Sequence, residues 1–362
     1  MKKIVLALIA ACVLLSGCQG KKEEIKIGVI LPLTGNGAIY GEDIKKGIDL
    51  AYSESNIKDK IQLLYQDDAA DTKTAINALT ALKNQGVSIC VGGVMSNVAK
   101  GLLPIINSHD ILLLSPKATD ISLSQVNDMF FRIWPTDDLD GRISAKYINL
   151  NPDFSKIAIL YSNTDYGVGI RKIFKEELSP TKEIVFDESF SSDIMDFKPV
   201  ISKLKSQNPD VVFFPAYYRE VVMALKCMNE LNCDFHIAGV SSFYDKDIKD
   251  ASGQLLDKIF FTYPEFDIDA DTPEMKRFVQ KYQECYNMDP NAFSAYGYDS
   301  YLVLETLIYK HMESGASETS GKDLYKILQG QNIVIKGVTG NIEFDEEGDA
   351  IRKLQLINLN AI

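Results

Sequence analysis

Histidine is scarce in this chain, with three in 362 residues, and none of His109, His236 and His311 lies in a catalytic pattern. A zinc site is not indicated either, because Cys227, Cys233 and His236 are not spaced as zinc ligands usually are. An enzyme needs a nucleophile, a base or a metal. These observations indicate neither an enzyme nor a cofactor or metal site.

Basic residues are fewer than acidic residues. The chain has 38 Lys and Arg against 50 Asp and Glu, a formal net charge of −12. The first 17 residues hold two of the lysines, so their removal would leave −14. An acidic body argues against a nucleic-acid partner and against adhesion to anionic lipid by charge. After the N-terminal apolar run, no segment is long enough to cross a membrane.

The N-terminus has the pattern of a targeting signal, and residues 1–17 are interpreted as a lipoprotein signal peptide. Lys2 and Lys3 precede an apolar run, residues 4–14, that is too short for a stop-transfer helix. Leu15-Ser16-Gly17-Cys18 resembles the lipobox of bacterial lipoproteins, which implies cleavage before Cys18 and a lipid on its thiol. An ordinary signal peptide with a chance cysteine is the alternative. Residues 18–24 would form a short tether.

Four cysteines remain in the body of the chain. Export permits disulfides, so Cys227 and Cys233, close in sequence near the end of a predicted helix, either pair or stay free. Cys90 lies in a strand-like apolar run, which is typical of a buried free thiol. About 345 residues are more than one compact core usually holds, so two lobes are expected.

The first part of the body predicts a strand, a loop and a helix. The apolar run from Ile25 to Leu31 indicates a strand covered on both faces, followed by small residues and an amphipathic helix. The loop is not a dinucleotide fingerprint, because Tyr40 stands at the third glycine position, and no Gly-Lys-Ser/Thr follows. It is either a simple turn with a core tyrosine or a ligand loop with Tyr40 as a wall.

From Ile61 onward, strands and helices alternate, and a second set with the same logic starts at Ile157. The early strands end in loops rich in Gly, Ser, Thr or Asp. Asp67-Asp68 is one such pair, which helix capping and loop hydrogen bonds explain more simply than catalysis. The loops of a parallel sheet emerge at one edge. The pattern therefore predicts two similar α/β lobes whose loop edges face each other. The last portion of the chain predicts helices over 273–286 and 298–313 and a polar loop over 314–321.

Short motifs in a fixed order carry a family resemblance over nearly all of the mature chain. They are Leu33-Thr34-Gly35, Tyr40-Gly41, Asp67-Asp68, Leu114-Ser115-Pro116, Phe131-Arg132, Asp165-Tyr166-Gly167, Asp196-Phe197, Pro209-Asp210-Val211, Gly337-Val338-Thr339-Gly340 and Gly348-Asp349. The chain resembles the type I periplasmic binding proteins of the leucine/isoleucine/valine-binding class, which are substrate-binding subunits of ABC importers. The resemblance implies an α/β fold of two lobes, each a mostly parallel sheet flanked by helices, joined by three crossover hinge segments.

Carried onto this chain, the first lobe would hold residues 25–136 and 264–340, and the second 137–263 and 341–362. The crossings would lie near residues 136–140, 262–265 and 341–344. The resemblance also implies a monomer that is exported, lipid-anchored and facing the periplasm or the cell exterior, with an ABC permease as partner. A ligand-binding sensor subunit with the same fold is the alternative function.

Family binding residues map onto strand ends in both lobes. Ser96, or Asn97 one residue later, matches the serine that holds a ligand carboxylate. Lys117, through its backbone, and Thr119 match a pair that contacts the same carboxylate. Aromatic residues match the walls of the site: Tyr40 in the first lobe, Tyr166 and Tyr217 in the second, and Phe293 near the ligand side chain. Edge packing is the plain alternative for each tyrosine.

Two departures from the family bear on the ligand. The glutamate for a ligand ammonium falls at Ser241, which has no charge, and Ala70 and Met95 replace a disulfide seen in some members. The expected ligand is a branched-chain or other aliphatic amino acid, with a carboxylic acid or amide that lacks an ammonium as second choice. For an amino acid, the anion would have to come from a nearby carboxylate: Asp137, Asp138 or Asp245.

Overall fold

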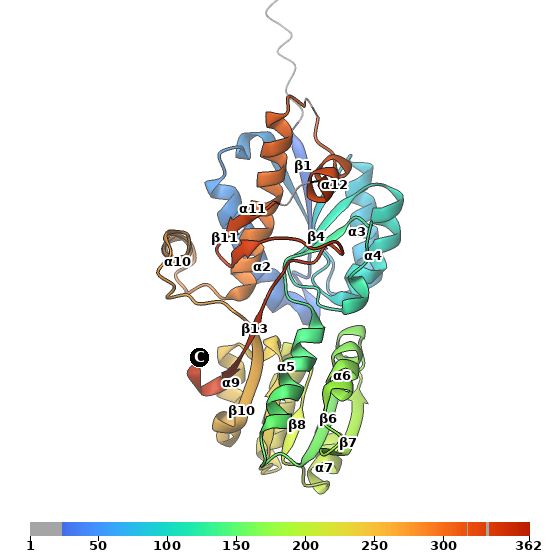
Figure 1. The fold of residues 1–362 in the computed structure, drawn as a ribbon, viewed down its shortest axis with the longest axis vertical. Coiled ribbons are helices and arrows are strands. Elements are labelled where there is room, and N and C mark those ends of the chain that lie inside the picture. Colours follow the sequence, from blue (N-terminus) through green and yellow to red (C-terminus); the bar gives the residue numbers. More distant parts are fainter. Residues whose placement is uncertain (1–23, 317, 331–332) are drawn as a thin grey trace, which may run out of the picture.

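A computed structural model describes residues 24–316, 318–330 and 333–362. The predicted signal peptide and Cys18 lie outside the described residues. The chain forms two α/β lobes stacked end to end, and α5 (Asp137–Leu150) and β13 (Leu354–Asn358) begin near the narrow region between them (Figure 1). Among the described residues, no helix combines the length and hydrophobicity that crossing a bilayer requires.

The first lobe is built on a five-stranded parallel sheet. Its strands are β1 (Ile25–Leu31), β2 (Ile61–Asp67), β3 (Ile89–Gly92), β4 (Leu112–Ser115) and β5 (Phe130–Arg132), in the order β2-β1-β3-β4-β5. The inner strands β1, β3 and β4 are almost fully buried, as expected for apolar strands covered on both faces. Helices α2 (Ala38–Glu54) and α11 (Ala292–Glu313) lie on one face, and α3 (Thr72–Asn84) and α4 (Ser96–Ser108) on the other (Figure 1).

Glycines set the close packing of α2 against α11. A Cβ added to Gly47 would lie 1.9 Å from the carbonyl oxygen of Ser294, and one added to Gly297 would lie 2.2 Å from that of Ile44. Only glycine permits such an approach of two backbones. The contact brings the start of α2 beside the start of α11, so that the rings of Tyr40 and Phe293 meet with centroids 5.1 Å apart.

The second lobe contains a six-stranded sheet in the order β13-β10-β9-β8-β6-β7. The strands are β6 (Lys156–Ser162), β7 (Glu183–Phe190), β8 (Val211–Phe213), β9 (His236–Gly239), β10 (Ile259–Pro264) and β13 (Leu354–Asn358). All neighbours are parallel except β13, which runs antiparallel to β10. The helices that belong to this lobe are α5 (Asp137–Leu150), α6 (Asp165–Glu177), α7 (Lys198–Ser206), α8 (Tyr218–Glu230) and α9 (Lys246–Ser252).

The chain passes between the two sheets three times, after β5, after β10 and before β13. The second passage leads to α10 (Pro273–Tyr286), which contacts α2. A bridge between Arg132 and Asp349 keeps the chain beside the first sheet until shortly before β13, which favours a third crossing later than residues 341–344. The predicted fold class is confirmed, and the exact lobe limits stay a prediction.

One helix differs from its predicted extent, and another was not predicted. α11 begins at Ala292 rather than at residue 298, because Asn291 caps it through the backbone N–H of Ser294. The predicted polar loop ends in a helix, α12 (Gly321–Gly330), whose first turn is capped by Ser320 and Asp323. A hairpin of β11 (Ile335–Gly337) and β12 (Gly340–Ile342) follows.

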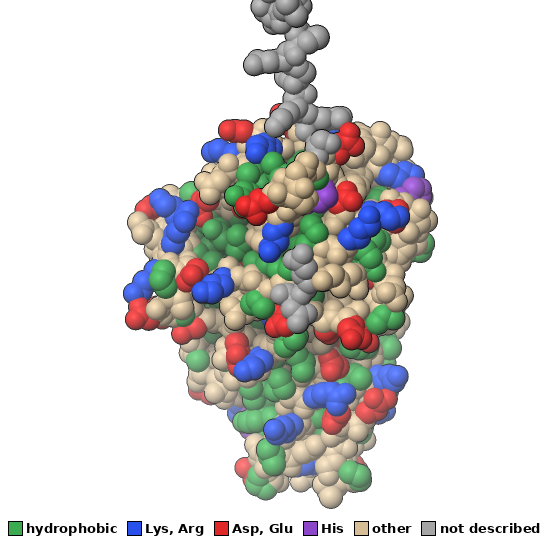
Figure 2. All heavy atoms as spheres, turned by 45° about the horizontal axis from the view of Figure 1, so that its top comes forward, with side chains coloured by type: hydrophobic (Ala, Val, Ile, Leu, Met, Phe, Trp, Pro, Cys, Tyr) green, Lys and Arg blue, Asp and Glu red, His purple; other side chains and the backbone are tan. Residues whose placement is uncertain are grey.

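The structure shows whether Cys227 and Cys233 form a disulfide. Cys227 and Cys233 are both free and buried, as is Cys90, whereas Cys285 is free and exposed. Acidic and basic side chains are interspersed over the face of the first lobe that Figure 2 shows, without a basic patch on that face.

Candidate functional site

The strand order of each sheet points to one place in each lobe. In open α/β sheets, ligands bind outside the carboxyl ends of strands at the point where the strand order reverses. In the first lobe that point lies between β1 and β3, and in the second between β6 and β8. Four of the expected site residues directly follow these strands: Tyr40 in α2, Ser96 at the start of α4, Tyr166 in α6 and Tyr217 just before α8.

These two loop edges touch. The hydroxyl oxygen of Tyr40 accepts a hydrogen bond from the backbone N–H of Tyr218 at 2.9 Å. Lys100 of α4 forms an ion pair with Asp165 of α6, with Nζ and Oδ2 3.4 Å apart. Tyr40, Ser96, Tyr166 and Tyr217 are all buried. The structure therefore shows the lobes closed upon each other at the edges where the sequence placed the site.

The hydroxyl of Ser96 accepts hydrogen bonds from the protein and has its own proton available for a ligand. Its Oγ accepts hydrogen bonds from the backbone N–H groups of Thr119 and Asp120, both at 3.3 Å. Within the described part of the chain, no acceptor takes the Ser96 hydroxyl proton. Ser96 also opens α4, whose first N–H groups carry the positive end of the helix dipole. These donors together suit an anion.

The side chain of Asn97, the alternative to Ser96, contacts the start of α3. Its side-chain amide donates to Thr72 Oγ1 at 3.3 Å, and the backbone oxygen of Asn97 accepts from the same hydroxyl. Because Thr72 starts α3, these contacts tie α4 to its neighbouring helix. The geometry favours Ser96 of the two.

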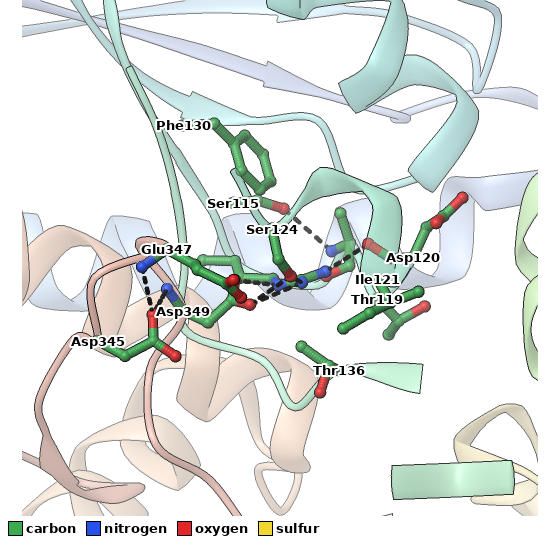
Figure 3. A network of polar contacts seen from close by, with 12 residues as sticks. Ser115, Thr119, Asp120, Ile121, Ser124, Phe130, Thr136, Asp345, Glu347 and Asp349 are labelled. Atoms are coloured by element: carbon green, nitrogen blue, oxygen red, sulfur yellow. Dashed lines mark hydrogen bonds and ion pairs between the residues drawn. The ribbon is translucent and has the colours of Figure 1, made fainter. Parts of the chain in front are cut away.

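The loop of residues 115–120 is fixed from beneath by a buried network. The guanidinium of Arg132 donates to the backbone oxygen of Asp120 at 2.9 Å and to Oδ2 of Asp349 at 2.9 Å. Ser124 donates to Asp349 at 2.6 Å. Figure 3 shows Ser124 next to Asp349, with Asp120 and Thr119 close by on the loop. The sequence marked Arg132 and Asp349 only as family motifs, without assigning them a role.

Lys117, on this loop, reaches into a group of aromatic rings. The side chain is buried, and Nζ lies 4.6 Å from the ring centroid of Tyr40. The rings of Tyr166, Phe293 and Trp134 lie 5.8, 5.8 and 5.9 Å away. All four distances are within the range of cation–π attraction. The sequence interpretation used only the backbone of Lys117, so its side chain is an addition made by the structure.

The aromatic residues also contact one another. Tyr166 and Tyr217 stack with centroids 5.0 Å apart, and Trp134 stacks on Phe293 at 5.2 Å. Trp134 was not foreseen, although it stands close to Phe131-Arg132 and is the only tryptophan of the chain. Such rings offer large apolar faces with polar tips, which suit a small organic body.

Each of the three carboxylates proposed to replace the missing glutamate accepts at least one hydrogen bond from the protein, but Oδ2 of Asp137 is buried and has no hydrogen-bond partner among the described residues. Asp137 is buried and its Oδ1 accepts from the backbone N–H of Ile121 at 3.2 Å. Asp138 accepts from the hydroxyl of Thr136, and Asp245 caps α9. Burial raises the pKa of Asp137 well above its usual value, with the nearby charges of Asp120 and Asp140 adding to the effect.

Asp140 was missed by the sequence interpretation. It is buried and accepts a hydrogen bond from the hydroxyl of Thr262. Burial raises the pKa of Asp140 to about 7, while Thr262 and the charge of Lys117 act in the opposite direction. Asp140 lies three residues after Asp137 in α5. Because residues three positions apart in a helix lie on the same face, both carboxyl groups belong to one face of α5.

Ser241 and Glu220 complete the edge of the second lobe. Ser241 is buried in a short turn between β9 and α9 and brings no charge. Glu220 accepts a hydrogen bond from the backbone N–H of Tyr217 at 2.7 Å and so positions that residue. In residues 24–316, 318–330 and 333–362, no group of three or more His, Cys, Asp or Glu side chains is arranged to hold a metal.

Comparison with known proteins decides the family. A model of the periplasmic binding protein family matches residues 24–361. The chain belongs to this family. The expected resemblance is thereby confirmed, and this family and fold are those of solute-binding proteins, as the scarcity of catalytic patterns indicated.

Several relatives of this periplasmic binding protein cover almost the whole chain. Leu/Ile/Val-binding protein homolog 2 of Brucella abortus (strain 2308) is 26% identical, over 96% of this chain and 94% of the relative. The Leu/Ile/Val-binding protein of Escherichia coli (strain K12) is 24% identical, over 95% and 93%.

Solved structures show the same fold. The branched-chain amino acid transporter substrate-binding protein LivJ from Streptococcus pneumoniae, solved with isoleucine, superposes with a TM-score of 0.82 at 25% identity, covering 93% of this chain and 96% of LivJ. A solute-binding protein of an ABC transporter from Rhodopseudomonas palustris, solved with benzoate, gives 0.79 at 19% identity, covering 93% of each chain. The second likeness concerns the fold alone.

Proposed function

We propose that this protein is the solute-binding subunit of an ABC importer and that it holds a small carboxylate-bearing solute between the loop edges of its lobes. The observation that carries the proposal is the meeting of Tyr40, Ser96, Tyr166 and Tyr217, which follow the strands at the switch points of both sheets. Relatives with this fold are described as binding isoleucine or benzoate, both of which bear a carboxylate.

The carboxylate would be bound at the start of α4. The Ser96 hydroxyl, the first N–H groups of that helix and the hydroxyl of Thr119 are neutral donors on buried residues. Hydrogen bonds to an ionised acceptor are shorter and stronger than those between neutral groups. The network of Arg132 and Asp349 would keep this loop in position before the ligand arrives.

The body of the solute would lie against aromatic rings of both lobes. Tyr40 and Phe293 belong to helices of the first lobe, and Tyr166 and Tyr217 to strand ends of the second. A ligand that contacts all of them joins the lobes, which is the usual basis of hinge closure in binding proteins. The names of the relatives favour branched-chain or other aliphatic amino acids. The neutral Ser241 and the buried Lys117 favour a second candidate, a carboxylate that lacks an ammonium.

The same proposal covers location and partners. Export with a lipid on Cys18 would anchor the protein by residues 18–24 to a bacterial membrane, facing the periplasm or the exterior, where it would deliver solute to a permease as a monomer. The lobe ranges given above form part of the proposal, with the third crossing set between the bridge at Asp349 and the start of β13 rather than at residues 341–344. A sensor subunit remains the alternative, and the genes beside this one would separate the two.

A panel of small carboxylates tests the proposal by thermal shift and calorimetry. A ligand at about 100 times its dissociation constant should add about 2.7 kcal/mol to the free energy of unfolding. Ser96→Ala should weaken binding of the stabilising ligand about tenfold or more, because a hydrogen bond to a charged group is lost. Asn97→Ala is the matched control and should leave affinity unchanged. Failure of every carboxylate in the panel to bind would contradict the proposed function.

A further inference from the structure

The ammonium of Lys117 lies in surroundings that offer it no hydrogen-bonded counter-ion. The side chain is 4% exposed, and among the described residues Nζ forms no hydrogen bond and no ion pair. Its surroundings are the rings of Tyr40, Tyr166 and Phe293, with Trp134 slightly farther away. Aromatic faces offset only part of the cost of removing an ammonium from water.

Nearby acidic groups do not supply the missing partner. Asp140 acts on Lys117 through its charge, but its carboxylate is hydrogen-bonded to Thr262. Glu220 is bound to the backbone of Tyr217, and Asp120 pairs with Lys100 at 2.7 Å. A buried cation without its own anion is a strong attractor for one that a ligand brings.

The same cation opposes a ligand ammonium. An α-amino acid carries its ammonium on the carbon next to the carboxylate, within a few ångströms of the group that Ser96 and Thr119 would bind. Lys117 lies two residues before Thr119 on the same short loop, so the two ammonium groups would be held close together in a site of low polarity. Ser241, at the position of the family glutamate, offers no anion to compensate.

We infer that Lys117 selects a carboxylic acid that lacks an ammonium group, and that its own ammonium takes the place of the one an amino acid would bring. The inference rests on the proposed function and narrows its substrate class. A 2-oxo acid fits best, because its oxo oxygen is an acceptor at the carbon where an amino acid has a donor, and Lys117 is a donor there. The rings around Lys117 suit an apolar or aromatic body on such an acid.

A matched pair of ligands tests this inference. L-Leucine and 4-methyl-2-oxopentanoate have the same carbon skeleton and differ only in ammonium against oxo group. Calorimetry on the whole mature protein should give a dissociation constant at least about tenfold lower for the oxo acid, because a charged hydrogen bond replaces a like-charge contact. Benzoate serves as a third probe, for an aromatic acid without an oxo group.

Two variants separate the role of Lys117 from general effects on folding. Lys117→Met keeps the length and apolar stem, so it should fold and yet bind the oxo acid about tenfold or more weakly. Lys117→Ala combined with Ser241→Glu exchanges the cation for an anion and should shift the preference toward leucine. Circular dichroism and the unfolding midpoint of each variant without ligand report whether it is folded.

The outcomes are distinct. Leucine binding as tightly as its oxo acid, or Lys117→Met keeping the wild-type preference, would overturn the inference while leaving the proposed function in place. Absence of binding by leucine, the oxo acid, benzoate and every other small carboxylate would overturn both. A tenfold preference for the oxo acid that disappears in Lys117→Met would support both.

Discussion

The hydroxyl oxygen of Tyr40 in the first lobe accepts a hydrogen bond from the backbone N–H of Tyr218 in the second, 178 positions later, at 2.9 Å. Burial raises the pKa of Tyr40, so its phenol stays neutral over the whole physiological range. The contact spans the two loop edges beside the proposed site. A single oxygen atom thus couples the closed arrangement of the lobes to a residue expected to touch the ligand.

Tyr40→Phe should favour the open form. The substitution keeps the ring but leaves the N–H of Tyr218 without its acceptor, which should cost the closed state about 1 kcal/mol, or roughly fivefold in ligand affinity. Calorimetry and small-angle scattering of the ligand-bound protein would measure both effects. Tyr52→Phe is the control, because the Tyr52 hydroxyl donates to Ile61 within the first lobe. Equal affinity for wild type and Tyr40→Phe would refute this coupling.

Asp349→Asn should destabilise the protein strongly. Arg132 is fully buried, and loss of the carboxylate leaves its guanidinium uncompensated, which typically costs about 3–5 kcal/mol. Urea unfolding followed by fluorescence would measure the loss. Glu177→Gln, in the solvent-exposed pair with Arg142, should cost about 1 kcal/mol or less. Similar costs for the two variants would show that the buried pair does not stabilise the loop as argued.

Stability should fall as pH rises from 5 to 7.5. Burial raises the pKa of Asp140 and of Glu220 to about 7 and that of Asp68 to about 6. In this window the folded state binds more protons than the unfolded state, so the free energy of unfolding decreases with pH. Calorimetric scans at constant ionic strength would record a falling midpoint, and Asp140→Asn should reduce the slope. A midpoint that rises with pH would contradict the assignment of these carboxyl groups.

The N-terminus should carry lipid. Lys2-Lys3, the apolar run and Leu15-Ser16-Gly17-Cys18 predict cleavage before Cys18 and a diacylglyceryl group on its sulfur. Mass spectrometry of protein from its native membrane would identify the modified N-terminal peptide. Cys18→Ala should abolish both the modification and the anchoring. An unmodified Met1, or cleavage at another bond, would exclude this form of export.

Much of the fold could be predicted from local sequence. Apolar strands followed by small-residue loops and amphipathic helices recur along the chain, and a parallel sheet has only one edge at which such loops can emerge. That rule predicted two facing loop edges, and the family resemblance assigned Tyr40, Ser96, Tyr166 and Tyr217 to them, where the structure has them. The helix α12 escaped prediction because its start looks like a polar loop, and its capping by Ser320 and Asp323 is evident only once the turn is formed.

The chemical character of the site depended on tertiary structure. The sequence interpretation assigned only the backbone of Lys117 to the site. In the structure, packing directs its side chain to rings from α2, α6, α11 and the segment after β5. Arg132 and Asp349 are 217 positions apart and meet only because the segment before the last crossing packs beside β5. Side-chain direction and desolvation arise from contacts between distant segments, so the sequence determined which residues reach the site, and only the folded chain decided what charge they present there.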